Sequence, residues 1–220
     1  LDPANFNNLM IYNCTKSKDG GLIYLGVSAG LDVPGIIDFG KTTIIKTDIN
    51  SDTIWTKFYD YLTVVPPSNY VLPTNIIESR NGDIYLCNND IPNLDFFTTF
   101  KGFIFHLNAQ GDSLGSYSIM GPGNSYCAAI IEGDDESIYA IFNEYPGFLY
   151  LEFKPVFTQF QSALHKLDKN LKLIQKSNFQ NQRSDLITSV CKTPDSNLAF
   201  FGLFRSVNYR TYLPGMIVLN

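Results

Sequence analysis

The stretch KTTIIKTDINSDTIWTKF (Lys41–Phe58) decides the fold, because its central part, IIKTDINSDTIW (Ile44–Trp55), recurs along the chain. Its ungapped copies are, in chain order, IFHLNAQGDSLG (Ile104–Gly115), LHKLDKNLKLIQ (Leu164–Gln175) and the beginning of a fourth, MIVLN (Met216–Asn220). The residues that open the polar turn stand 60 positions apart and are Asp48, Asn108 and Asp168. Ungapped copies at equal spacing indicate a repeat architecture.

A second pattern, a Gly/Asp/Asn turn followed by an aliphatic–aromatic strand, alternates with the first. It occurs in SKDGGLIYLG (Ser17–Gly26), SRNGDIYLCN (Ser79–Asn88), GDDESIYAIF (Gly133–Phe142) and TPDSNLAFFG (Thr193–Gly202). Each repeat therefore predicts four short strands, a to d, in which polar turns join a to b and c to d. We expect an all-β protein, a β-propeller of four-stranded blades with about four repeats of about 60 residues. A β-sandwich with accidental internal similarity is the alternative.

The repeats divide the chain at about 1–59, 60–119, 120–179 and 180–220, within one predicted domain, 1–220. The last repeat contains strands a, b and c but lacks the outer strand d. This indicates a fragment of a longer propeller, or one whose C-terminal part was not included. A blade with a free edge also invites association with another chain.

Composition excludes some partners. Aromatic residues make up 14% of the chain, and the net charge is −5 with a pI of about 4.9. Lys and Arg form no stripe, so we expect no nucleic-acid partner. No apolar run approaches the roughly 18–20 residues of a membrane span. The N-terminal stretch lacks the layout of a signal peptide, and because the chain starts with Leu1 we favour a removed leader or trimming.

DGGLIYLG (Asp19–Gly26), followed by IIKTDINSDTIWTKFY (Ile44–Tyr59), resembles the repeats of secreted and cell-surface propellers of Bacteroidetes-type bacteria, with the pattern DGGxIxxG … IxKxDxxGxxxW. The resemblance covers nearly the whole chain as repeats. It implies an extracellular, cell-surface or periplasmic location, in some cases with a lipid anchor lost from the N-terminus. Such propellers are mostly binding or scaffold domains.

The polar turn of the first copy has the acidic spacing of a calcium loop, with Asp48, Asn50 and Asp52 at its first, third and fifth positions. It lacks the glycine and the distal glutamate that such a loop needs, because the sixth residue is Thr53. We therefore expect hairpin-turn chemistry and no metal. Trp55, the only tryptophan, is interpreted as blade packing.

The remaining reactive residues do not form a recognised catalytic motif. His106 and His165 fall in adjacent columns of strand c, so their rings should face opposite ways, as surface or half-buried imidazoles without a metal. The acidic run Asp134–Glu136 is expected to be a solvated turn. The cysteines are expected to be buried thiols on strands, and their three possible pairings stay open; they are Cys14, Cys87, Cys127 and Cys191.

The connections between strands b and c are longer than hairpins need, and long loops in compact domains are often functional. They are 28–41, 91–102, 144–160 and 205–215, and they are rich in aromatic residues. We predict that they form a binding surface for a protein or glycan, with packing of the aromatics on one another as the alternative. The predicted binding residues are Phe96, Phe97, Phe100, Tyr145, Phe148, Tyr150, Phe153, Tyr209, Arg210 and Tyr212.

The leading hypothesis is a propeller that binds or scaffolds through this surface, without enzyme activity and without a cofactor. One alternative is a propeller-type glycan hydrolase or lyase with an axial active site, for which Glu78 and Glu132 are the chief candidate acids. The other is a purely structural repeat segment of a long surface protein.

Overall fold

The computed structural model describes residues 9–33, 36–59, 70–91, 101–119, 124–145, 149–151, 154–156, 161–179, 186–205 and 212–219. These residues form β-strands joined by turns, and no helix occurs among them. Three sheets have four strands and one has three, each in simple antiparallel order, and a two-stranded hairpin stands apart. The predicted all-β propeller with about four blades is thus confirmed.

The strands of the four blades follow the predicted repeats. The first blade contains β1 (Leu9–Lys16), β2 (Leu22–Val33), β3 (Ile36–Thr47) and β4 (Thr53–Tyr59). The second contains β5 (Tyr70–Glu78), β6 (Ile84–Ile91), β7 (Lys101–Leu107) and β8 (Ser113–Ser118). The third contains β9 (Asn124–Glu132), β10 (Ile138–Tyr145), β13 (Gln161–Leu167) and β14 (Leu173–Asn178). The fourth contains β15 (Leu186–Lys192), β16 (Leu198–Arg205) and β17 (Tyr212–Leu219), without an outer strand among the described residues.

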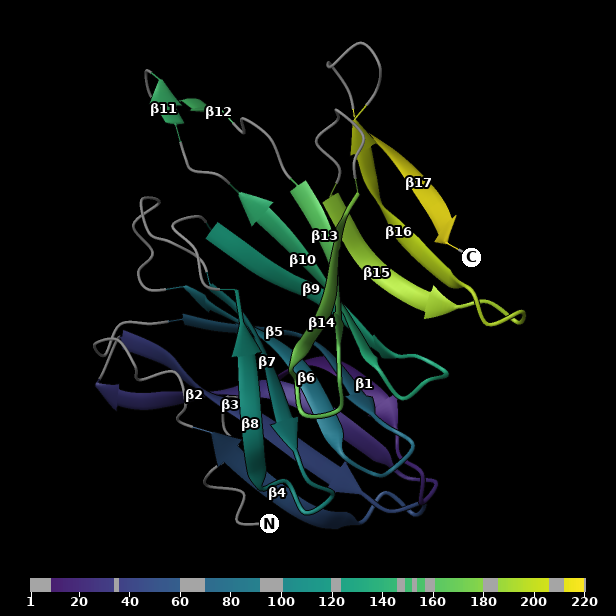
Figure 1. The fold of residues 1–220 in the computed structure, drawn as a ribbon. Helices are drawn as coiled ribbons and strands as arrows, with labels where there is room; N and C mark the ends of the chain where they lie inside the picture. The colour runs from purple at the N-terminus through teal and green to yellow at the C-terminus, as the bar shows by residue number, and fades with distance from the viewer. Residues whose placement is uncertain are drawn as a thin grey trace.

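The blades fan out in chain order, with the first at the bottom and the fourth at the top of Figure 1. The first strands of successive blades, β1, β5, β9 and β15, lie next to one another and form the inner edge of the fan. In such meanders all a–b and c–d turns lie on one side, which we call the turn face. The opposite side, at which each strand b ends, is called the loop face; the end of β2 marks it at the left of Figure 1.

The c–d turns have the predicted chemistry. Oδ1 of Asp48 accepts hydrogen bonds from the backbone N–H groups of Asn50 and Asp52, at 2.9 and 2.8 Å. Asn108 and Asp168 make the same pair of bonds in the second and third blades. This bonding occupies the carboxylate that a calcium ion would need, and it confirms the turn interpretation.

Apolar side chains fill the space between blades. Because side chains alternate along a strand, β6 sends Ile84 and Leu86 toward the first blade, and Tyr85 and Cys87 toward the third. Trp55 packs against the cluster between the first two blades, as predicted. A third cluster joins Ile141, Leu164, Ile187 and Phe200, among others, between the third and fourth blades.

Two predictions about local structure were wrong. The stretch 28–41, expected to be a loop, is mostly strand, because β2 and β3 continue outward to residues 33 and 36. Only two of the four cysteines are buried: Cys87 and Cys127 are, whereas Cys14 and Cys191 are exposed. The exposed pair lies on β1 and β15, in the two end blades, each of which has a neighbouring blade on one side only.

Candidate functional site

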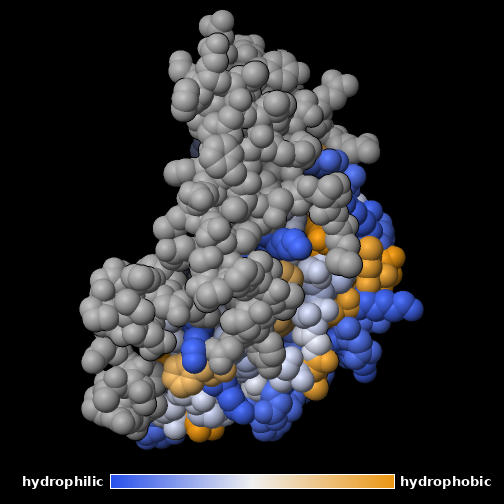
Figure 2. Space-filling model, turned by 90° about the vertical axis from the view of Figure 1, so that its left-hand side faces the viewer, coloured by the Kyte–Doolittle hydropathy of each residue, from blue (hydrophilic) through white to orange (hydrophobic). Residues whose placement is uncertain are grey.

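Most of the predicted aromatic binding residues lie outside the part of the chain that the structure describes. Seven of the ten lie outside the described residues: Phe96, Phe97, Phe100, Phe148, Phe153, Tyr209 and Arg210. The other three lie on strands, with Tyr145 at the end of β10, Tyr150 in the small hairpin formed by β11 (Leu149–Leu151) and β12 (Lys154–Val156), and Tyr212 at the start of β17. Seen from the loop face, the described surface shows small hydrophobic areas between hydrophilic ones (Figure 2). The aromatic surface therefore stays a prediction.

Glu78, the first candidate acid, is an interblade clamp on the turn face. It ends β5, and its side chain is only 2% exposed. Its Oε1 lies 3.0 Å from Nζ of Lys46, and its Oε2 accepts hydrogen bonds from the Ser17 hydroxyl and the Lys18 N–H, at 3.0 and 2.6 Å. Both oxygens thus hold the first blade, which leaves neither for acid–base chemistry.

Glu132, the second candidate acid, joins the third blade to the second in the same way. It ends β9, and its carboxylate accepts two hydrogen bonds from the backbone N–H of Arg80, at 3.2 and 3.0 Å. In the fourth blade the equivalent residue is Lys192, which pairs at 2.8 Å with Asp134 in the preceding turn. Glu78 and Glu132 are therefore positioned for structure rather than catalysis.

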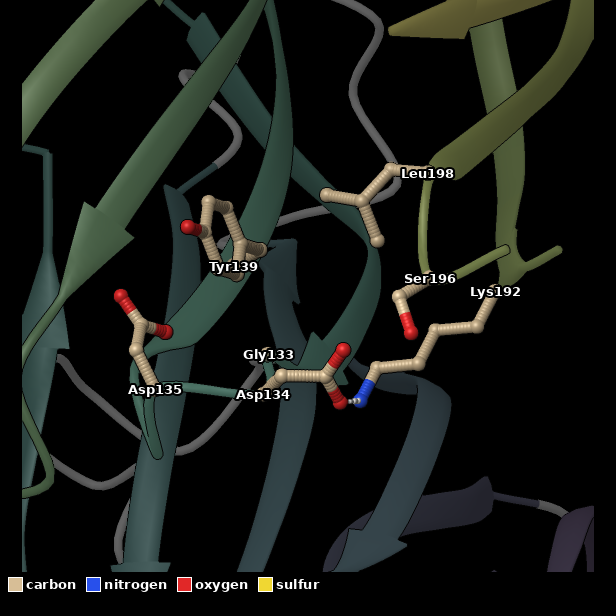
Figure 3. A pocket seen from close by; sticks show the side chains of 7 residues that line it. All are labelled: Gly133, Asp134, Asp135, Tyr139, Lys192, Ser196 and Leu198. Carbon is tan, nitrogen blue, oxygen red and sulfur yellow. Dashed lines mark hydrogen bonds and ion pairs between the residues drawn. The ribbon is translucent and has the colours of Figure 1, made fainter. Parts of the chain in front are cut away.

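A pocket of about 230 Å³ opens on the turn face, between the a–b turns of the third and fourth blades. Figure 3 shows the ion pair between Asp134 and Lys192 at its lower edge, with Tyr139 and Leu198 above the pair. Lys192 lowers the pKa of Asp134, and Lys166, 2.6 Å from Asp135, lowers the pKa of that carboxyl. Each charged group in the pocket already has a protein partner, so the pocket offers no free charge to a ligand.

Asp90, on the loop face, has a different environment. It lies near the end of β6 and is 5% exposed. Asn88, on the same side of the strand, donates a hydrogen bond to Thr42 of the first blade, so this side faces the first blade. Within the described part of the structure, Oδ1 of Asp90 has no hydrogen-bond partner. Burial raises the pKa of this carboxyl, and the charge of Lys101 opposes the shift only in part.

Glu144 holds the equivalent place in the third blade, near the end of β10. His165 and then Lys176 lower the pKa of its carboxyl. The Nε2 atom of His165 lies 3.7 Å from Oε1 of Glu144, too far for a hydrogen bond, whereas Nζ of Lys176 lies at 2.5 Å. We therefore take the ion pair with Lys176 as the direct contact. Tyr117 of the second blade hydrogen-bonds to Nδ1 of His165 at 2.8 Å, which fixes the ring.

The two histidines are more deeply buried than expected, at 5% and 2% exposure for His106 and His165. His106 stacks on Tyr85, whose hydroxyl reaches the third blade, while His165 contacts Tyr117 of the second blade. Their rings thus face opposite ways, as predicted. The described residues contain no group of three or more His, Cys, Asp or Glu side chains that could hold a metal ion.

The sequence contained a sign of Asp90 and Glu144 that the prediction overlooked. Each stands five residues after the aromatic of its strand b, namely Tyr85 and Tyr139. An acid in the same column of two neighbouring blades places two carboxylates at the same depth of the loop face. The predicted acids, Glu78 and Glu132, instead end strand a of their blades and lie on the turn face.

No protein-family model and no curated protein matches the chain. Among solved structures it is similar to an endo-arabinase from Bacteroides thetaiotaomicron, with 11% identity and a TM-score of 0.50 over 96% of this chain and 74% of that one. It also matches an apocarotenoid oxygenase mutant from Synechocystis, at 10% identity and a TM-score of 0.49 over 96% of this chain and 50% of that one. A mannose phosphorylase from Leishmania mexicana matches at 8% identity and a TM-score of 0.46, over 98% of this chain and 65% of that one.

At sequence identities this low, the likeness to the arabinase shows that the two chains share a fold and does not show a shared activity. The arabinase is a propeller glycosidase, and this finding overturns our expectation that the chain is not an enzyme, since that expectation rested on the binding and scaffold domains of similar repeats. No helix among the described residues is long and apolar enough to cross a membrane. Fold and likeness together establish the chain as a β-propeller of about four blades, similar in fold to a propeller glycoside hydrolase.

Proposed function

We propose that the chain is a glycan-acting enzyme of the propeller type, a glycoside hydrolase or lyase, whose reacting carboxylates are Asp90 and Glu144. The observation that carries the proposal is that these two acids hold equivalent places on the loop face while their pKa values shift in opposite directions. Environments that separate the pKa values of two carboxyls are how enzymes assign one acid and one base at the same pH. The fold of the arabinase supports the same class.

Asp90 would serve as the general acid. Its raised pKa keeps the carboxyl protonated at a higher pH than an exposed aspartate, so that it can give its proton to the oxygen of the leaving sugar. The buried Oδ1, which has no hydrogen-bond partner within the described residues, supplies an atom still able to bind a substrate group. An unsatisfied buried oxygen costs stability, and a functional role accounts for its retention.

Glu144 would be the ionised partner. Lys176 stabilises its negative charge, and the Tyr117–His165 contact holds the neighbouring ring in place. An ionised carboxylate can activate a water molecule for attack on the anomeric carbon, or attack that carbon itself. In a lyase the same group would remove the proton next to a uronic acid carboxylate. In each case the glycan would lie over the loop face, where the predicted aromatic residues are expected to contact it.

The proposal is tested with a panel of arabinans, galactans, mannans and uronic-acid polysaccharides, by measuring reducing ends for hydrolysis and unsaturated products for elimination. We expect activity on one class, and a loss of about a hundredfold or more in kcat for Asp90→Asn and for Glu144→Gln. Asp112→Asn is the matched control, because Asp112 lies exposed on a c–d turn and pairs with Lys57. Folded wild-type protein that cleaves no member of the panel would refute the proposal, as would variants that keep full activity.

A further inference from the structure

Two buried cysteines from neighbouring blades meet in the core. Cys87 lies on β6 of the second blade and Cys127 on β9 of the third, and both are 0% exposed. Their sulfur atoms lie 2.6 Å apart. Unbonded heavy atoms pack at about 3.5–4.0 Å, so the fold brings these two thiols closer than an ordinary packing contact.

The backbone around Cys127 is held firmly against the second blade. The side-chain amide of Asn89 accepts a hydrogen bond from the Cys127 N–H at 2.7 Å and donates one to the Cys127 carbonyl at 3.2 Å. The Thr74 hydroxyl donates a further bond to the same carbonyl, at 2.8 Å. Asn89 and Thr74 belong to the same blade as Cys87, so three hydrogen bonds fix β9 where the two sulfur atoms meet.

We propose that Cys87 and Cys127 form a disulfide bond that joins the second blade to the third. The two thiols give up two protons and two electrons as the S–S bond forms, and a disulfide oxidant such as oxidised glutathione accepts both and becomes two thiols. Cys14 and Cys191 lie on β1 and β15, the inner strands of the first and fourth blades, and take no part in this bond.

The timing of the bond follows from its surroundings. Burial, and then contact with Cys87, raises the pKa of the Cys127 thiol, so the reactive thiolate is scarce once the blades have closed. We therefore expect the bond to form while the second and third blades are packing together, and to resist reductants afterwards. It crosses the interface between the blades that carry Asp90 and Glu144, and so fixes their relative position.

The test uses the whole chain, refolded from denaturant in a mixture of reduced and oxidised glutathione. After denaturation and alkylation without reductant, mass spectrometry should show a peptide that links Cys87 to Cys127, with Cys14 and Cys191 each alkylated or carrying glutathione. Four alkylated thiols, or glutathione adducts on Cys87 or Cys127, would overturn the proposal.

Melting temperatures measured with and without oxidant distinguish stabilisation by the disulfide from stabilisation by the packing of the two side chains. Cys87→Ala with Cys127→Ala should lower the Tm by roughly 5–15 °C under oxidising conditions. The same variant should differ far less from wild-type protein refolded with all cysteines reduced, because both then lack the bond. The double variant Cys14→Ala with Cys191→Ala is the control, and its Tm should depend on oxidant as that of the wild-type protein does, because it keeps Cys87 and Cys127. An equal loss in the presence and absence of oxidant would show that the pair acts through packing alone.

Discussion

Removing the charge of Glu78 should weaken the contact between the first two blades and lower the free energy of unfolding. Glu78→Gln keeps the shape of the side chain but removes the negative charge that lies 3.0 Å from Nζ of Lys46. The side chains of both residues are nearly inaccessible, at 2% and 9% exposure. Removing one partner of a buried pair costs about 3–5 kcal/mol. Lys46 keeps a second, more exposed partner, Asp19, at 3.2 Å, so we expect the lower end of that range, about 3 kcal/mol.

The loss is measured by urea unfolding, followed by far-UV circular dichroism and by the fluorescence of Trp55, which packs in the same interblade cluster. Asp112→Asn breaks the exposed pair with Lys57 and should cost less than about 1 kcal/mol. A double-mutant cycle of Glu78→Gln with Lys46→Met isolates the pair itself. If Glu78→Gln lowers the free energy of unfolding no more than Asp112→Asn does, or if the cycle shows no coupling energy, Glu78 does not clamp the first two blades together.

Three further predictions concern single residues. The pKa of Asp90 is raised in the folded state, so above about pH 4 this carboxyl binds more protons when folded than when unfolded, and its contribution to stability falls as the pH rises. The stability of Asp90→Asn relative to wild type should therefore be higher at about pH 8 than at about pH 4, as measured by denaturation curves at both pH values. An equal difference at the two pH values would contradict the raised pKa. Ser51 is exposed with a φ of 69°, so Ser51→Gly should raise stability by about 1 kcal/mol, whereas Gly111→Ala, at the equivalent turn position with a φ of 79°, should lower it in the same thermal assay. Tyr85→Phe removes the 2.7 Å hydrogen bond to the Lys169 carbonyl and should cost about 1 kcal/mol, measured by urea unfolding; no loss would mean that water replaces the bond.

The blades could be predicted from the sequence because a propeller repeats a local pattern. The column of Asp48, Asn108 and Asp168 marks a turn whose hydrogen bonds stay within five residues, so its chemistry is visible in the chain itself. The repeat pattern also predicted that the fourth blade has no outer strand, and the described residues contain none there. The extension of β2 and β3 was missed because Gly30, Gly35 and Pro34 within 28–41 suggested a loop, whereas the two strands support each other in pairing.

The pKa shifts at the candidate site were beyond this kind of reasoning, because they depend on contacts between residues that lie far apart in the chain. His165 and then Lys176 lower the pKa of Glu144, and they lie 21 and 32 positions further along the chain. Glu78, which looked free in the sequence, is neutralised by Lys46, 32 positions before it. A strand pattern predicts which face of the sheet a side chain occupies, but not which charged group of a neighbouring strand or blade it contacts.

The distribution of paired charge separates the two faces of the propeller. On the turn face Glu78, Glu132 and Lys192 each reach back to the a–b turn of the preceding blade, and Asp134 is shared by Arg80 and Lys192. Pairs of this kind hold blades in register, and they leave little free charge for a ligand. On the loop face a buried carboxyl oxygen of Asp90 lacks a hydrogen-bond partner among the described residues, at a cost in stability. The unsatisfied oxygen of Asp90 therefore supports the proposal that a glycan substrate would react on the loop face.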